Sequence, residues 1–160
     1  MELSDLAPVL TPELVEFVQS GVAVGVATRD ESMQPALARA WGPHLAADRR
    51  SLTVCVSAAE GSATRANLDR NGAVAIGFCP PTIAKSVQLK GVAAVLGEPG
   101  PNDLERVERH VRAFTVECDR IGVPPEVSSR MFEGSALVLI SVSIDEGFDQ
   151  TPGPTAGRRL

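Results

Sequence analysis

Both lysines of this chain lie in one short segment, residues 80–91, which reads PPTIAKSVQLKG. The chain has 15 basic residues, and all the others are arginines. On a strand, Ser86, Gln88 and Lys90 would share one face, while Lys85 would take the other. Ammonium, hydroxyl and amide groups together suit a phosphate and a flat polar ring. The alternative interpretation is an edge strand whose exposed lysine discourages aggregation.

Two further stretches offer donors for an anion. Ser62 and Thr64 stand at the start of a predicted helix, where free N–H groups and the helix dipole attract negative charge. Their commoner role is simply to cap the helix. Arg39 lies between alanines in ALARAWG, residues 36–42. It is able to grip a phosphate or carbonyl oxygen with two N–H groups, or to pair with a carboxylate of its own chain.

Composition excludes several classes of function. The net charge of −5 provides no basic field for nucleic acid. Three widely spaced cysteines without a CxxC pattern predict neither a disulfide framework nor a metal site. The first residues, MELSDLAPVL, lack a basic signal-peptide region, and no apolar run reaches membrane-spanning length. We therefore expect a cytoplasmic protein with no metal, and no catalytic residue can be named.

The elements that position these residues follow from hydrophobic periodicity. Large residues alternate with Ala and Gly in several short runs, which is typical of strands. Apolar residues recur at helical spacing over 102–121, and we expect His110 on the exposed, charged side of that helix. The strands are expected at 22–28, 36–42, 51–57, 73–78, 84–96 and 135–144, and the other main helices at 11–20 and 61–71.

This pattern predicts a mostly β, α+β fold: an antiparallel barrel with flanking helices. We expect one domain over residues 1–160, with a core from about 12 to 145. The tail, 146–160, is rich in Pro and Gly, and we expect it to be irregular.

Taken in order, the hairpin VAVGVAT…QPALARAWG, the strand SLTVCVS, the helix SATRANLDRNG and AVAIGF before PPTIAKSVQLKG resemble the pyridoxamine 5′-phosphate oxidase-like flavoproteins. The resemblance covers roughly residues 12–97, with the strand at 135–144 closing the domain. It is nearest to small general members of that group. It implies a six-stranded split barrel, a homodimer with FMN at the subunit interface, and FMN-dependent oxidoreductase activity on a small molecule.

The resemblance also implies which residues would hold the cofactor. Arg39 and its neighbours would line the flavin, Ser57 would lie beside it, and the helix start would hold the phosphate. The full set is Arg39, Ala40, Trp41, Ser57, Ser62, Thr64, Lys85, Ser86 and Gln88.

The sequence departs from the vitamin B6 enzyme itself. The helix start carries Ala63 and Thr64 where that enzyme has a basic pair, and SVSIDEGFDQ offers no match to its substrate-binding arginine and histidine. We therefore do not predict B6 oxidase activity. Two alternatives stay open. One is a haem-binding or haem-degrading protein with His44 or His110 as axial ligand. The other is a non-catalytic dimer that binds a flavin or a deazaflavin.

Overall fold

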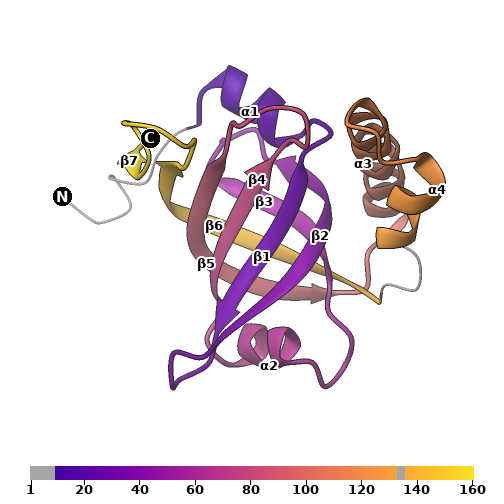
Figure 1. Ribbon diagram of the computed structural model, residues 1–160. Coiled ribbons are helices and arrows are strands. Elements are labelled where there is room, and N and C mark those ends of the chain that lie inside the picture. Colours follow the sequence, from indigo (N-terminus) through magenta and orange to yellow (C-terminus); the bar gives the residue numbers. More distant parts are fainter. Residues whose placement is uncertain (1–9, 133–135) are drawn as a thin grey trace.

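Six antiparallel strands close into a barrel in this protein (Figure 1). The computed structural model describes residues 10–132 and 136–160. Around the barrel the order is β3-β2-β1-β4-β5-β6, and β3 pairs with β6 to close the ring. The strands are β1 (Ala23–Arg29), β2 (Pro35–Leu45), β3 (Ser51–Ser57), β4 (Ala73–Cys79), β5 (Val87–Gly97) and β6 (Leu137–Asp149), and the short β7 (Arg158–Arg159) adds to β6. The predicted α+β split barrel is confirmed.

The barrel closes around the large residues of each alternating run. Val26, Val54, Ile76, Phe78 and Ile140 come from four different strands, and each is fully buried. Each such side chain contributes roughly 1.5–3 kcal/mol when it leaves water. The small residues that alternate with them consequently point outward, and on β1 and β4 they are half-exposed.

Four α-helices in the described residues flank the barrel. In Figure 1, α1 (Pro12–Val18) lies over one end and α2 (Ala63–Arg70) over the other. The long α3 (Pro101–Arg120) and the short α4 (Pro125–Ser128) lie beside β2. Trp41 is buried between β2 and α3, where it makes edge-to-face contacts with Phe114 and Phe132. None of the described helices is long and apolar enough to cross a membrane.

Three element boundaries differ from the sequence prediction. β5 begins at Val87 and not at residue 84, although the Ser86 carbonyl still accepts the Gln150 N–H at 2.8 Å. β2 runs on through His44 to Leu45, with an irregular register after Trp41, so no loop surrounds His44. β6 extends to Asp149.

The tail is also more regular than predicted. Its first residues continue β6, and β7 pairs with them, so that Phe148 faces Arg159 across the ladder. Gly157 has a φ of +86°, a conformation that glycine adopts without strain, and this residue lets the chain turn back. The tail therefore packs on its own barrel.

The prediction that His110 lies on the exposed side of its helix is wrong. Its side chain is 5% exposed, because it stands three residues after Val107 and four before Phe114, on the same buried stripe. Both ring nitrogens are used. Nδ1 accepts the Gly42 N–H at 3.1 Å, so Nε2 carries the proton and donates to the Val22 carbonyl at 2.8 Å.

Candidate functional site

The outward face of β1, β4 and β5 presents a row of residues that suits a flat ligand. Gly25 pairs with Arg39 on one side and with Gly77 on the other, and Gly77 pairs with Gln88. Two glycines thus separate an arginine from a glutamine across four neighbouring strands. In Figure 1, no described helix lies in front of these strands.

Ser57 belongs to the same row. Ala40 pairs with Val56, so the next step of that register places Arg39 beside Ser57. The Ser57 hydroxyl is buried and has no hydrogen-bond partner among the residues that the structure describes. A buried hydroxyl without a partner is costly, and a ligand atom that reached it would remove that cost.

A hollow of about 440 Å³ lies over the middle of this row, where Arg39, Gly25 and Gly77 line it; Ser57 and Gln88 lie at the two ends of the row and are not part of its lining. A Cβ added to Gly77 would meet nothing within 4 Å, and one added to Gly25 would meet only the Leu37 side chain, at 3.4 Å. The floor is therefore bare backbone, on which a ring system can lie closely. Around it stand Ala23, Leu37, Arg39, Cys79 and Ser86.

Arg39 keeps its donors available at the edge of this hollow. It is half-buried, with its guanidinium carbon 5.9 Å from the centroid of the Trp41 ring. Among the described residues, no carboxylate lies within salt-bridge distance of it. Among the described residues, Arg39 therefore has no carboxylate with which to form the structural ion pair of the alternative interpretation.

The side chains of Ala40 and Trp41 do not point toward the hollow. Ala40 is fully buried in the barrel interior, and Trp41 is 1% exposed beneath α3. Only their backbones are available to a ligand on this row. The Trp41 indole N–H is buried without a partner among the described residues.

Ser62 and Thr64 lie at the start of α2, outside the hollow. The Ser62 hydroxyl accepts the Arg65 N–H at 3.2 Å, which is the capping role. Thr64 is 5% exposed, and Arg65 pairs with Asp69 at 3.0 Å. The structure does not bring this helix start together with Arg39 and Gln88 in one cavity.

The two lysines point to different places. The Lys85 ammonium lies 4.4 Å from the centroid of the Phe17 ring of α1. The Lys90 ammonium lies 5.2 Å from that of Phe148. Ser86 borders the hollow, whereas Lys85 lines a different cavity.

The sequence analysis did not predict a hydrogen bond that fixes the loop carrying Ser86. Thr82 donates from its hydroxyl to a Glu117 carboxylate oxygen at 2.5 Å, and Glu117 also pairs with Arg120. This contact fixes the loop between β4 and β5 against α3. The sequence analysis also did not single out Cys79, which is exposed at the hollow. No sequence signal marks Thr82, but Cys79 could have been found as the outward residue that ends its strand.

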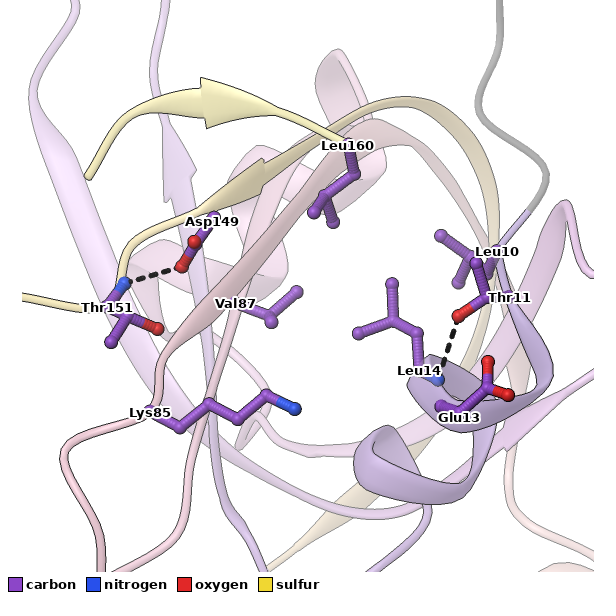
Figure 2. Close-up of a pocket in the computed structure, with 9 residues that line it drawn as sticks. All are labelled: Leu10, Thr11, Glu13, Leu14, Lys85, Val87, Asp149, Thr151 and Leu160. Carbon is purple, nitrogen blue, oxygen red and sulfur yellow. Dashed lines mark hydrogen bonds between the residues drawn. The ribbon is translucent and has the colours of Figure 1, made fainter. Parts of the chain in front are cut away.

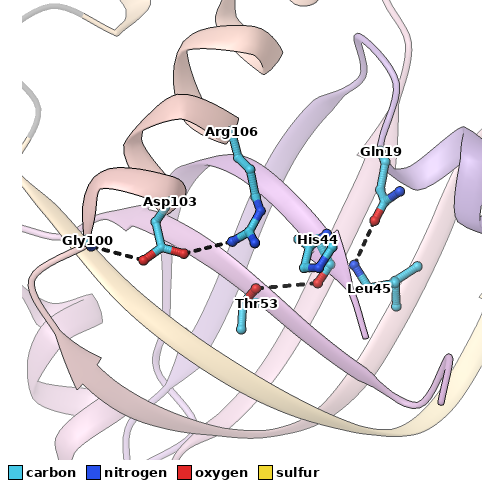
Figure 3. Close-up of polar contacts among 7 residues, drawn as sticks. All are labelled: Gln19, His44, Leu45, Thr53, Gly100, Asp103 and Arg106. Atoms are coloured by element: carbon cyan, nitrogen blue, oxygen red, sulfur yellow. Dashed lines mark hydrogen bonds and ion pairs between the residues drawn. The ribbon is translucent and has the colours of Figure 1, made fainter. Parts of the chain in front are cut away.

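His44 lies near Arg106 and the start of α3 (Figure 3), and it lines a different hollow together with Arg106 and Arg109. Asp103 accepts the Gly100 N–H and pairs with Arg106, each at 2.9 Å. Burial lowers the pKa of His44, and the nearby Arg106 lowers it further, while Asp103 opposes them. His44 and His110 line this hollow together, away from the row of Arg39 and Gln88.

Comparisons with known proteins identify the fold. No protein-family model and no curated protein matches the sequence. Solved structures do match, with a TM-score of 0.54 for an F420 reductase, which is 16% identical over 82% of this chain and 93% of that one. A protein from Lactobacillus delbrueckii described provisionally as a pyridoxamine 5′-phosphate oxidase gives 0.51, at 17% identity over 87% and 93%. HutZ, the haem storage protein of Vibrio cholerae, gives 0.51, at 18% identity over 88% and 94%.

This protein therefore has the split-barrel fold of the pyridoxamine 5′-phosphate oxidase-like proteins, as the sequence predicted. Proteins with this fold include one named for a deazaflavin and one named for haem.

Proposed function

We propose that this chain is an FMN-dependent oxidoreductase that acts on a small molecule. The observation that supports it is the row Ser57–Arg39–Gly25–Gly77–Gln88, which places hydrogen-bonding side chains around a bare floor. The residues fit the cofactor on two counts: the Ser57 hydroxyl is buried without a described partner, and a Cβ at Gly77 would stand in open space. Bound FMN would supply the electron transfer.

The chain's own residues would bind and orient the ring. Arg39 would donate to a carbonyl or phosphate oxygen, as charge-assisted donors do. Ser57 and Gln88 would contact polar ring edges, and Leu37 would exclude water from one side. We retain the prediction that Lys85 contacts the cofactor. That contact would have to be made to the cofactor of a second subunit, because in its own subunit Lys85 faces α1.

A homodimer is part of this proposal. Leu37 is 75% exposed on the outward side of β2, and it lines the hollow. An exposed large apolar side chain beside a binding hollow suits an interaction surface. A second copy placed there would cover both Leu37 and the floor of the hollow.

The visible absorption spectrum of the purified protein separates the candidate cofactors. FMN gives flavin bands, and haem gives a Soret band. The deazaflavin alternative is supported by the shared fold of an F420 reductase and would use the same flat floor. The haem alternative has less support, because His110 would have to break two hydrogen bonds before it could ligate iron, and His44 lines a different hollow from the one over the row. Oxidation of a reduced nicotinamide by the flavin-loaded protein would then distinguish an enzyme from a carrier.

Gly77→Val tests the hollow directly. The added Cβ would meet nothing within 4 Å and the methyl groups would enter the hollow, so the variant should fold and lose FMN affinity by at least about tenfold, or ~1.4 kcal/mol. Fluorescence titration of FMN measures this. Ser143→Val, on an exposed position of β6, is the matched control and should bind as the parent does. Equal affinity of the two variants would rule out this hollow as the flavin site.

Arg39→Ala tests the proposed charge-assisted donor. Loss of that bond should weaken FMN binding by about 1.5–3 kcal/mol in the same titration. Arg112→Ala is the control, because Arg112 is 70% exposed on the outer side of α3. If the Arg39 variant binds FMN as tightly as the Arg112 variant, Arg39 does not belong to the flavin site. The matching titration of Lys85→Ala decides whether that lysine reaches the cofactor.

A further inference from the structure

A second cavity, of about 500 Å³, lies between α1, the segment that enters β5 and the last residues of the chain (Figure 2). Cavities of roughly 300–1,000 Å³ hold small organic ligands. In Figure 2, the aliphatic side chains converge on its centre from different elements, and Lys85 runs along one side. The lining consists of Leu10, Thr11, Glu13, Leu14, Lys85, Val87, Asp149, Thr151 and Leu160, and no member of the flavin row belongs to it.

The residues that line this cavity are held in place by hydrogen bonds and by burial. Leu10 is 1% exposed, and its carbonyl accepts a guanidinium N–H of Arg49 at 2.9 Å. Val87 is 3% exposed on the inward side of β5. The Leu160 N–H donates to the Gly147 carbonyl at 2.9 Å, which holds that side chain over the opening. The apolar part of the site is therefore built before any ligand arrives.

The lining of the cavity carries one ammonium, that of Lys85, and two carboxylates, those of Glu13 and Asp149, whose oxygens accept from donors of their own segments. Asp149 accepts the Thr151 N–H at 2.9 Å and the Thr155 hydroxyl at 3.1 Å. Hydrogen bonding to Thr151, first through its backbone, lowers the pKa of Asp149. The pKa of Glu13 is lowered by hydrogen bonds, first to its own backbone N–H and then to Thr11. Both carboxylates thus already have donors.

The Lys85 ammonium, in contrast, has no carboxylate partner among the described residues. It lies over the Phe17 ring. An aromatic face stabilises a cation, but it leaves the ammonium N–H groups able to donate. The available polar group beside this apolar cavity is therefore a hydrogen-bond donor with a positive charge.

We propose that this cavity binds a small amphipathic carboxylate. The carboxylate accepts from the Lys85 ammonium, and the hydrocarbon part lies among Leu10, Leu14, Val87 and Leu160. Each further methylene that enters the cavity should increase affinity by about fourfold until the space is filled. The site is separate from the flavin hollow, although Ser86, which borders that hollow, directly follows Lys85 in the chain.

The small number of lysines gives a sharp test. Reductive dimethylation with ¹³C-formaldehyde keeps the positive charge and labels only Lys85, Lys90 and the amino terminus. Octanoate, added to flavin-free protein, should shift the Lys85 methyl signal in a saturable way and leave the Lys90 signal in place. Hexanoate should bind about 15-fold more weakly. Equal shifts at both lysines, or shifts that never saturate, would overturn the proposal.

Variants provide the matched comparison by calorimetry. Lys85→Met should reduce octanoate affinity at least about tenfold, whereas Lys90→Met, which removes the other lysine, should not. Leu14→Trp, which fills the cavity from α1, should abolish binding while the Lys85 signal persists. Octanoate binding that survives both Lys85→Met and Leu14→Trp would place the ligand elsewhere. Because the protein is free of flavin throughout, failure of the flavin proposal leaves this result unaffected.

Discussion

The three cysteines differ in their access to solvent, and that difference reports on the proposed flavin hollow. Cys79 is exposed at the hollow, whereas Cys55 and Cys118 are buried. Burial raises the pKa of Cys55 to about 11, and burial also raises that of Cys118. Since the thiolate is the reactive form, a maleimide at about pH 8 should modify Cys79 and leave the other two intact in the native protein.

FMN should protect Cys79 from this reaction. A ligand lying on the Gly25–Gly77 floor would cover the neighbouring thiol, so saturating FMN should slow modification severalfold. Peptide mass spectrometry at timed intervals measures the rate at each cysteine. Urea-unfolded protein, in which all three thiols react, is the control. An unchanged rate at Cys79 with FMN bound would separate the flavin from this hollow.

The buried His110 should make stability depend on pH near neutrality. Burial lowers its pKa, although the bond to the Val22 carbonyl opposes this. The unfolded chain, with a histidine pKa of about 6.5, then binds the proton more readily than the folded one. His110 therefore contributes stability above about pH 6.5, and that contribution is lost as the pH falls from there through the lower, folded pKa.

Urea unfolding between pH 8 and pH 5 measures this loss. His110→Gln should be less stable at pH 8 and should show a flatter pH dependence. His44→Gln is the control for the only other histidine, whose pKa is also lowered but which is less buried. Each unit of pKa depression corresponds to ~1.4 kcal/mol. A His110 variant with the same pH slope as the parent would contradict the assignment of the neutral, doubly bonded ring.

At this scale, strand alternation explains which of the expected site residues share a face of the barrel. Ser57, Arg39 and Gln88 lie on one row because strand alternation and register bring them there. Trp41 was expected at the flavin, but its side chain lies under α3. Alternation tells which residues share a face of a strand, but it does not tell which part of that face a helix will cover.

At the scale of elements, Gly91 marks the point where β5 bends beside β6. A Cβ there would lie 1.9 Å from the Ser143 carbonyl oxygen, and the register of the two strands shifts at that point. Gly91→Ala should therefore destabilise the barrel by about 3 kcal/mol, as overpacking of a fixed backbone does. Gly77→Ala, where the added Cβ meets nothing, should have little effect. Thermal unfolding of the two variants checks this, and equal melting temperatures would contradict it.

The boundaries of the elements were less predictable than their order. The spacing of apolar residues found every barrel strand and the long helix, because burial of one face imposes that spacing. It did not find the true start of β5, because the pairing that defines this strand begins with Val87 opposite Asp149, which is distant in sequence. It placed His110 outside, since a polar residue within a charged helix gives no sign of partners on other strands.

At the scale of the whole molecule, the order of the strands around the barrel could be predicted only from the resemblance to a known family and not from the hydrophobic pattern. Short strands separated by turns predict antiparallel pairing, but closure of β3 against β6 joins segments about 80 residues apart. The two proposed sites illustrate the same limit. Lys85 and Ser86 are neighbours in sequence, yet they line different cavities, because the loop between β4 and β5 separates α1 from the outward face of the barrel.

The exposed face of β1, β2, β4 and β5 should join two copies of the chain. Leu37 is the most exposed large apolar residue of the described chain, and it lies beside the proposed flavin row. Leu37→Glu would place two like charges in the contact, so we expect a monomer in sedimentation velocity where the parent is a dimer. Val116→Glu, at a 52% exposed position on the outer side of α3, should remain dimeric. FMN affinity should fall when dimerisation is lost, because the partner completes the site. A Leu37 variant that stays dimeric and binds FMN fully would show that the subunits meet elsewhere.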